Sequence, residues 1–257
     1  MEEYLNFFNN YTKHYMQIAK NDFQKVHINR KIEHSKRVNK FSIEIAKELK
    51  LEENEQYIIN IASLLHDIGR FEQFYKYSTY VDKDSVNHAL LGCQILEEKQ
   101  ILNKLKEDEK NTIIEIIKMH NYKELPKDIS QKLYLLASII RDADKIDWLY
   151  AMVNIIPNLS QENQAVFYSN KPEKNYISKE LVNLILNDQK IARSNLTTRD
   201  ELRVSGIAWI TSDINCKPSY NIIKKEDIIN KTYKLMKDSE EKKIIFDYIY
   251  SYMNKLN

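Results

Sequence analysis

Apolar residues recur every three or four positions along most of the chain, which is the spacing of one face of an α-helix. This spacing predicts a first helix over residues 4–16 and a second from about Asn29 to Leu49. A third, nearly all-apolar helix ends near Leu65 and is expected to be buried. Gly69 is expected to end it in the left-handed conformation, which splays two successive side chains, and His27 falls in the predicted turn between the first two helices.

The middle of the chain is predicted to contain one long loop and three more helices. Residues 71–87 have no clean period and are expected to form a loop, and because the loop joins two polar helix ends it is the predicted lid over a binding site. His88 opens the next helix, His120 closes the one after it, and a long helix is predicted from about Asp128 to Tyr150. Polar residues therefore stand repeatedly at the ends of apolar helices.

The last third of the chain has weaker patterns. Residues 172–188 are predicted to be a loop that leads into a helix, Thr197 and Thr198 resemble a helix start, and the final segment over about 228–253 predicts two amphipathic helices. The 257 residues include only 3 Gly and 4 Pro while 43% are hydrophobic, so the chain lacks the turn-formers that a sheet protein needs. The predicted fold class is all-α.

The charge balance narrows the expected partners. Lys and Arg number 39 against 37 Asp and Glu, a formal net charge of +2, so nothing favours a polyanion and nucleic acid is not the expected partner. No apolar run approaches the roughly twenty residues that cross a bilayer, and the N-terminus lacks the pattern of a targeting segment. Cys93 and Cys216 are isolated, which fits a reducing compartment. We therefore expect a cytoplasmic protein with no membrane partner.

The candidate chemistry lies at His66 and Asp67, where the apolar third helix stops. Burying a carboxylate beside an imidazole costs several kcal/mol unless a cation compensates, so the pair predicts either a buried ion pair or a metal site. The pair alone does not separate these two interpretations. Further candidate ligands at element ends favour the metal: His34, His88, His120 and Asp144.

This arrangement resembles the HD superfamily of metal-dependent phosphohydrolases, whose pattern is a histidine, a His-Asp pair, optional further histidines, and an aspartate on a later helix. The resemblance covers about Ile32 to Met152. It implies an HD bundle at about 29–152. Together with the helical pattern of the remaining residues, this predicts a single all-helical domain over residues 1–257, with a C-terminal helical extension at about 177–257 packed on the bundle.

The resemblance also implies the metal ligands. Helical spacing allows either Asp142 or Asp144 to be the last one, and the family pattern favours Asp144 because a basic and then an apolar residue follow it. Asp142 and Asp147 then support the ligands from outside or lie on the surface. The first ion is expected at His34, His66, Asp67 and Asp144, and a second at Asp67, His88 and His120. Such ligands suit manganese, iron, nickel or zinc.

The activity implied by the resemblance is hydrolysis of a phosphoester by metal-activated water, with a nucleotide or another small phosphorylated molecule as substrate. Asp67, Arg70 and Lys145 are the predicted catalytic residues. Arg70 and Lys145, together with Arg37, are the predicted substrate-binding residues, although Arg37 is more readily explained as holding a carboxylate. The chain has no Gly-rich phosphate loop and no Gly-X-Ser-X-Gly elbow, which argues against nucleoside-triphosphate motors and serine hydrolases.

Two alternatives stay open. Some HD proteins with four histidines and two aspartates hold two irons and activate oxygen, and ligand identity alone does not distinguish them from hydrolases. Other HD modules bind a nucleotide without catalysis and regulate a partner. That alternative is less favoured because such modules are expected to have lost a ligand, and this chain keeps the whole set.

Overall fold

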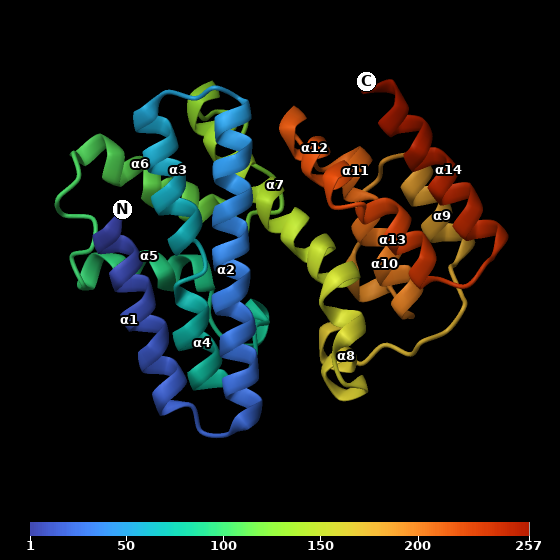
Figure 1. The fold of residues 1–257 in the computed structure, drawn as a ribbon, viewed down its shortest axis with the longest axis horizontal. Helices are drawn as coiled ribbons and strands as arrows, with labels where there is room; N and C mark the ends of the chain where they lie inside the picture. Colours follow the sequence, from blue (N-terminus) through green and yellow to red (C-terminus); the bar gives the residue numbers. More distant parts are fainter. Residues whose placement is uncertain (257) are drawn as a thin grey trace. The chain divides into compact units, whose positions relative to one another are not determined.

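The computed structural model describes residues 1–256, and this part of the chain contains helices and no strand. The all-α prediction is confirmed. Contacts group the chain into two units, Met1–Asp144 and the part from Lys145 onward (Figure 1). Whether the second unit is an extension of a single HD domain stays a prediction. Among the described residues, no helix has both the length and the apolar character needed to cross a membrane.

The N-terminal unit is built from helices that pack around α3. Its elements are α1 (Glu2–Ile18), α2 (Asp22–Glu48), α3 (Glu53–Leu65), α4 (Gly69–Tyr77), the 3₁₀ helix η1 (Asp82–Asp84), α5 (His88–Glu98), α6 (Glu107–Met119) and the first part of α7 (Gln131–Asn154). α1 and α2 run antiparallel, and α3 and α4 pack against both (Figure 1). On α1, Tyr4 and Phe8 are fully buried one turn apart, and the Phe8 ring meets Phe71 edge to face at 6.0 Å. Each such ring contributes about 1.5–3 kcal/mol by burial.

α2 begins earlier than its apolar pattern indicates, and this corrects the placement of His27. The helix starts at Asp22, because Asn21 accepts a hydrogen bond from the Gln24 amide and caps it. His27 therefore lies inside the helix and is 4% exposed, with its ring stacked on Phe74 at a centroid distance of 5.0 Å. The prediction of a turn or surface histidine was wrong because an imidazole can pack among aromatic rings as an apolar group.

The predicted loop over residues 71–87 is a helix in its first part. α4 runs to Tyr77, and Phe71 and Phe74 are buried on its inner face. Gln73 is fully buried as well, and this polar residue on the inner side hid the helical period. Ser78 ends the helix in the left-handed conformation (φ 53°), so the true connection to α5 covers only residues 78–87.

Gly69 opens α4 instead of ending α3 in a left-handed turn. No glycine among the described residues has a positive φ. A side chain at Gly69 would overlap the His88 carbonyl oxygen and lie 2.7 Å from the Gly92 amide nitrogen, so glycine is required for the close approach of α5. The turn between α3 and α4 is instead a tight one, in which the Arg70 amide donates to the Asp67 carbonyl at 2.9 Å.

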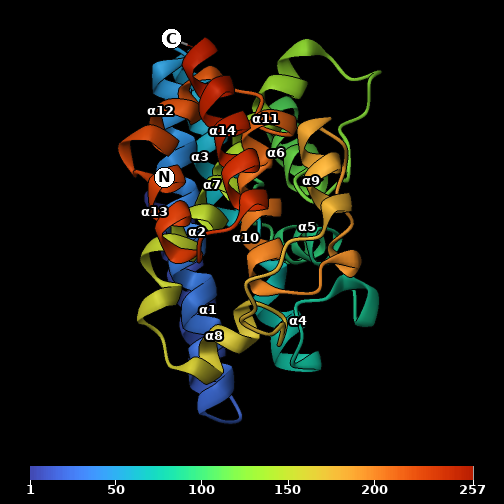
Figure 2. The same cartoon turned by 90° about the vertical axis from the view of Figure 1, so that its right-hand side faces the viewer.

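The C-terminal unit is a second group of helices. After the remainder of α7 it contains the 3₁₀ helix η2 (Ile156–Asn158), α8 (Gln161–Phe167), α9 (Lys179–Leu186), η3 (Arg193–Asn195), α10 (Arg199–Ile207), α11 (Trp209–Ser212), α12 (Lys217–Lys225), α13 (Ile228–Leu235) and α14 (Glu240–Lys255). α10 packs against α9, α13 and α14 (Figure 2). Thr198 caps α10 by accepting from the Glu201 amide, so the predicted helix start is confirmed.

Candidate metal centre

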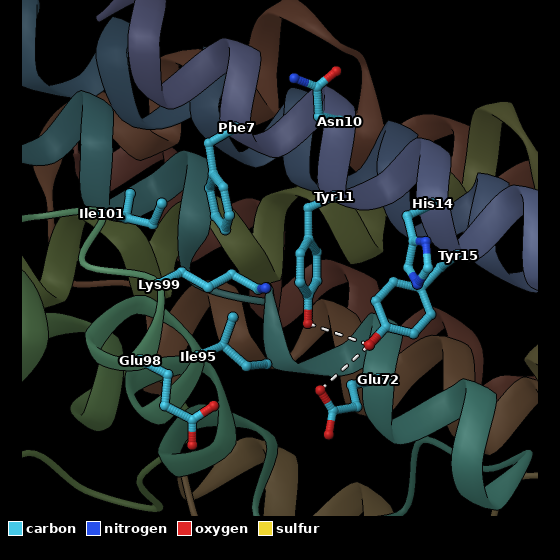
Figure 3. A pocket seen from close by; sticks show the side chains of 10 residues that line it. All are labelled: Phe7, Asn10, Tyr11, His14, Tyr15, Glu72, Ile95, Glu98, Lys99 and Ile101. Carbon is cyan, nitrogen blue, oxygen red and sulfur yellow. Dashed lines mark hydrogen bonds between the residues drawn. The ribbon is translucent and has the colours of Figure 1, made fainter.

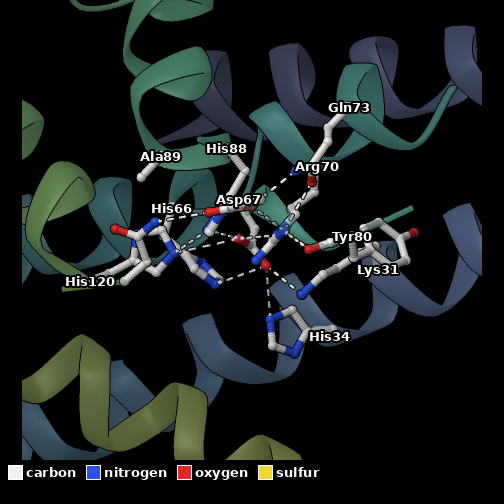
Figure 4. Close-up of polar contacts among 12 residues, drawn as sticks. Lys31, His34, His66, Asp67, Arg70, Gln73, Tyr80, His88, Ala89 and His120 are labelled. Carbon is white, nitrogen blue, oxygen red and sulfur yellow. Dashed lines mark hydrogen bonds and ion pairs between the residues drawn. The ribbon is translucent and has the colours of Figure 1, made fainter. Parts of the chain in front are cut away.

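The centre of the site is the Asp67 carboxylate, which is buried in the turn that follows α3. Four histidines from four different helices or helix ends surround it (Figure 4). Each carboxylate oxygen faces its own pair of them. The structure therefore brings together residues that are up to 86 positions apart in the sequence, from His34 to His120.

The first group faces Asp67 Oδ2. His34 Nε2, from α2, lies 3.2 Å from this oxygen, and His66 Nε2 lies 3.5 Å from it. Asp144, on α7, places its Oδ1 atom 3.3 Å from His34 Nε2. His34, His66 and Asp144 each offer a ligand atom within 4.8 Å of the others, a spacing that a single metal ion can bridge.

The second group faces Asp67 Oδ1. His88 Nε2 lies 3.3 Å from this oxygen and His120 Nε2 lies 3.5 Å from it. The two Nε2 atoms are 3.0 Å apart. His88 opens α5 and His120 directly follows α6, as the sequence predicts.

The hydrogen bonds on the far side of the rings decide which nitrogen carries the proton. In three of the histidines Nδ1 faces an oxygen that only accepts: His66 faces Ser63 O at 2.7 Å, His120 faces Ile117 O at 2.6 Å, and His88 faces Asp82 Oδ2 at 2.7 Å. Nδ1 must therefore donate, which leaves the lone pair on Nε2. All three lone pairs point toward Asp67, an arrangement that is typical of imidazoles that bind a metal.

The donors near this concentration of acceptors do not satisfy all of them. His66 Nε2 and Asp67 Oδ1 are buried without a hydrogen-bond partner, and the His88 and His120 lone pairs face one another at 3.0 Å. A buried polar atom without a partner costs about 1–3 kcal/mol, so several of them in one place require a cation. Imidazole nitrogens and carboxylate oxygens are the ligands that divalent transition metals prefer. The residues present fit such an ion.

The electrostatics keep these groups in the forms that bind metal. Burial lowers the pKa of His66 to about 3 and that of His88 to about 4, so both are neutral at pH 7. Burial opposes ionisation of Asp67, but the positive charge of the Lys31 ammonium outweighs it and holds the pKa of that carboxyl well below its usual range. Neutral imidazoles around an ionised carboxylate are the state that coordinates a cation.

Comparison with known proteins identifies the domain. Residues 32–149 match the sequence model of the HD domain family. Residues 32–149 therefore form an HD domain, a little under half of the chain. Over 117 residues, 44% of this chain, it is 35% identical to the CRISPR system single-strand-specific deoxyribonuclease Cas10/Csm1 (subtype III-A) of Methanocaldococcus jannaschii. The match covers only 13% of that protein. No solved structure matches the chain.

The N-terminal unit also contributes a cation to the centre that was not predicted from the sequence. Lys31 Nζ lies 2.5 Å from Asp67 Oδ2, the oxygen that also faces His34 and His66 (Figure 4). Lys31 precedes His34 by three residues on α2, so both project from the same face of that helix. The three-residue spacing between Lys31 and His34 is the sequence signal that could have indicated this cation.

Arg70 reaches the centre and is anchored in the segment that follows α4. Its Nε atom lies 3.5 Å from Asp67 Oδ1. Its Nη1 atom donates to the Tyr80 carbonyl at 2.5 Å, to Asp82 Oδ1 at 2.9 Å and to Gln73 Oε1 at 2.9 Å. The guanidinium therefore connects the HD aspartate to residues 78–87, and its assignment to substrate phosphate stays a prediction.

The other predicted side chains have different surroundings. Lys145 lies in the C-terminal unit, where its ammonium donates to the Asp213 carbonyl at 2.9 Å and lies 3.5 Å from the Asp213 carboxylate. Arg37 is half-buried on α2, one turn beyond His34. The substrate roles of Lys145 and Arg37 stay predictions. Asp142 and Asp147 are both buried, so neither is a surface group.

A cavity of about 500 Å³ lies elsewhere in the N-terminal unit, between α1 and the end of α5 (Figure 3). Its lining includes Phe7 and Tyr11, and a hydrogen-bonded chain runs from Tyr11 through Tyr15 to Glu72. None of the predicted metal ligands or phosphate contacts lines it. The chemistry of the HD domain is therefore concentrated in a buried cluster and not in this cavity.

Proposed function

We propose that the HD domain is a metal-dependent phosphoester hydrolase with two divalent ions. The first would be held by His34, His66, Asp67 and Asp144, and the second by Asp67, His88 and His120. The observation that supports the proposal most directly is the arrangement around Asp67, whose two oxygens each face a different pair of imidazole Nε2 atoms. HD domains are generally metal-dependent hydrolases, which supports the same reaction class.

The side chains around Asp67 fit this chemistry. Bound ions would polarise the phosphoester and lower the pKa of a coordinated water from about 15.7 to roughly 7. Asp67 would hold both ions at a fixed separation, and Lys31 and Arg70 would supply positive charge at its two oxygens. A phosphate that enters the centre would meet these two cations, whose side chains remain 20% and 16% exposed.

The proposed substrate is a nucleotide or another small phosphorylated molecule. Single-stranded DNA is a second candidate, because the archaeal relative is named as a single-strand-specific deoxyribonuclease. Against DNA stands the formal net charge of only +2, which supplies little of the positive surface that a polyanion needs. Both substrates are phosphoesters, so they share the reaction and differ in what surrounds the phosphorus.

The test uses the full chain, loaded in turn with manganese, iron, nickel or zinc. Elemental analysis is expected to give close to two ions per chain, and a panel of nucleotides, an aryl phosphoester and a single-stranded oligonucleotide is expected to be hydrolysed in at least one case. Asp67→Asn is expected to lose both ions and to slow hydrolysis roughly a thousandfold or more, because it removes the negative charge shared by both groups.

The assays are run under nitrogen as well as in air. Hydrolysis that does not depend on oxygen supports the proposal. An inert panel, together with a ferrous protein that consumes oxygen, would instead favour a di-iron oxygenase. An inert panel with no oxygen consumption and tight nucleotide binding would favour the non-catalytic module.

A further inference from the structure

Asp82 is a hub of hydrogen bonds beside the HD centre. It lies in η1, within the segment 78–87 that connects α4 to α5. Its carboxylate accepts from four side chains: Arg70 Nη1 at 2.9 Å, Gln73 Nε2 at 2.9 Å, His88 Nδ1 at 2.7 Å and Asn121 Nδ2 at 3.3 Å. These four donors reach both oxygens, so the carboxylate acts only as an acceptor. Asp82 is therefore held as a carboxylate.

His88 Nδ1 donates to a side chain, whereas the Nδ1 atoms of His66 and His120 donate to backbone carbonyls. His66 and His120 lie directly after their helices, so each Nδ1 reaches a backbone carbonyl three residues earlier in the same helix. His88 opens α5 and has no preceding helical turn to supply that carbonyl. The carboxylate of Asp82 takes its place, with its two oxygens at 2.8 and 2.7 Å from His88 Nδ1.

The same carboxylate fastens the segment 78–87 to α4. Gln73, which is fully buried on α4, donates to Asp82 and also to Ser85 Oγ and the Val86 carbonyl, each at 2.9 Å. Arg70 donates to the Tyr80 carbonyl and to Asp82. Asp82 therefore contributes both to the seating of this segment and to the orientation of His88.

We propose that Asp82 is a positioning residue for the second ion. Its carboxylate holds His88 in the tautomer that carries the proton on Nδ1, so that the Nε2 lone pair faces Asp67 Oδ1. Binding of the second ion thereby requires the segment 78–87 to be seated. This inference rests on the proposed two-ion function. Lost support from such an outer carboxylate typically weakens metal affinity 10–100-fold.

The test compares Asp82→Asn with Asp84→Asn in the full chain. Asp84 is the matched control because it lies in the same 3₁₀ helix and is exposed. Manganese titration by calorimetry is expected to show the second binding event of Asp82→Asn weakened roughly 10–100-fold, with the first unchanged. Asp84→Asn is expected to match the wild type in both events. Asp82→Glu, which keeps the charge, is expected to restore part of the lost affinity.

A second readout does not depend on metal. Nitrogen-15 NMR of the metal-free protein is expected to show His88 protonated on Nδ1 in the wild type and a mixture of tautomers in Asp82→Asn, because an amide can either accept or donate. Wild-type affinity for both ions in Asp82→Asn, or an unchanged tautomer, overturns the inference. A wild type that takes up no second ion contradicts the proposed function instead, while the tautomer still tests Asp82.

Discussion

The two units of the chain each contain a buried cluster of charges, and the clusters differ in how their hydrogen bonds are matched. In the C-terminal unit the buried Arg203 donates to Asp200 Oδ1 at 2.6 Å and to the two oxygens of Glu173 at 2.5 and 3.1 Å. Its Nε atom lies 3.4 Å from the Tyr168 hydroxyl. Every nitrogen of this guanidinium thus has an acceptor, and the cation is part of the chain.

The cluster around Asp67 has the opposite balance. Inward-facing lone pairs of His66, His88 and His120 gather around a carboxylate, and Lys31 and Arg70 supply the nearby donors without satisfying Asp67 Oδ1. Buried charge by itself therefore does not indicate function. A surplus of acceptors over donors indicates a site that binds a cation, whereas a cluster with matched donors and acceptors indicates a structural role.

The largest effect is expected from breaking the balanced cluster. Arg203→Met leaves Asp200 buried without its cation, so the free energy of unfolding is expected to fall by about 3–5 kcal/mol in a denaturant titration. The metal content of the protein that remains folded is expected to be unchanged. The control is Arg199→Met. Arg199 contacts Glu173, whose side chain is half-exposed, so the loss of this pair is expected to lower the free energy of unfolding by only about 1 kcal/mol.

A change in metal stoichiometry in folded Arg203→Met would contradict this separation of roles. So would a loss no larger than that of Arg199→Met, because it would mean that the buried Asp200 tolerates the absence of its partner.

Apart from α4, the sequence predicted the helices of the N-terminal unit and the residues that gather at its centre, and the physical reasons are local. Apolar periodicity marks α3, α5 and α6, and histidines at their ends are drawn together once those helices pack. His34 and Asp144 were candidate ligands by their positions at element ends, and the family pattern chose Asp144 over Asp142, which periodicity could not separate. Their roles as ligands stay predictions.

The sequence did not reveal the side chains that support the centre from outside. Lys31 and Asp82 are ordinary charged residues by type, and only tertiary packing brings them to Asp67 and His88. α4 was predicted as a loop because the buried polar residue Gln73 interrupts the apolar period of the helix. The sequence suggested that Gly69 stops α3. Glycine is needed there because α5 approaches closely, and α5 lies later in the chain, so the sequence around Gly69 does not show this need.

An intermediate effect is expected from acid. Burial holds the pKa of His66 at about 3 and that of His88 at about 4, while in the unfolded chain both have pKa values near 6.5. Between these values the unfolded chain binds more protons than the folded one, so stability is lost as the pH falls. From pH 7 to about 5.5 these two histidines together are expected to cost the metal-free protein about 2.5 kcal/mol of unfolding free energy, measured by denaturant titration.

Two further histidines calibrate the acid prediction. Burial also lowers the pKa of His27 to about 4, so His27→Gln is expected to reduce the slope of stability against pH, measured relative to its own value at pH 7. His14 is exposed, so His14→Gln serves as the matched control for the substitution itself. A flat profile between pH 7 and 4.5 would contradict the assignment of neutral buried imidazoles.

The smallest effect is expected at Lys31, and it tests whether the surplus of acceptors is real. In the metal-free protein the Lys31 ammonium is the cation nearest to Asp67. Lys31→Met removes it from a buried carboxylate, so the metal-free protein is expected to lose about 2 kcal/mol of unfolding free energy, less than a fully buried pair because Lys31 is 20% exposed. Lys36→Met, on the same helix with an exposed partner in Glu33, is expected to cost under about 0.5 kcal/mol.

The decisive measurement is whether Lys31→Met binds the first ion more tightly or more weakly than the wild type. If Lys31 only partly neutralises a site built for a stronger cation, the first ion is expected to bind roughly tenfold more tightly to Lys31→Met, because it no longer competes with the ammonium at Asp67 Oδ2. The metal-loaded variant then regains stability through binding alone. A variant that is less stable and also binds the ion more weakly would show that Lys31 supports the ligands, as Arg203 supports Asp200, and the contrast between the two clusters would disappear at this residue.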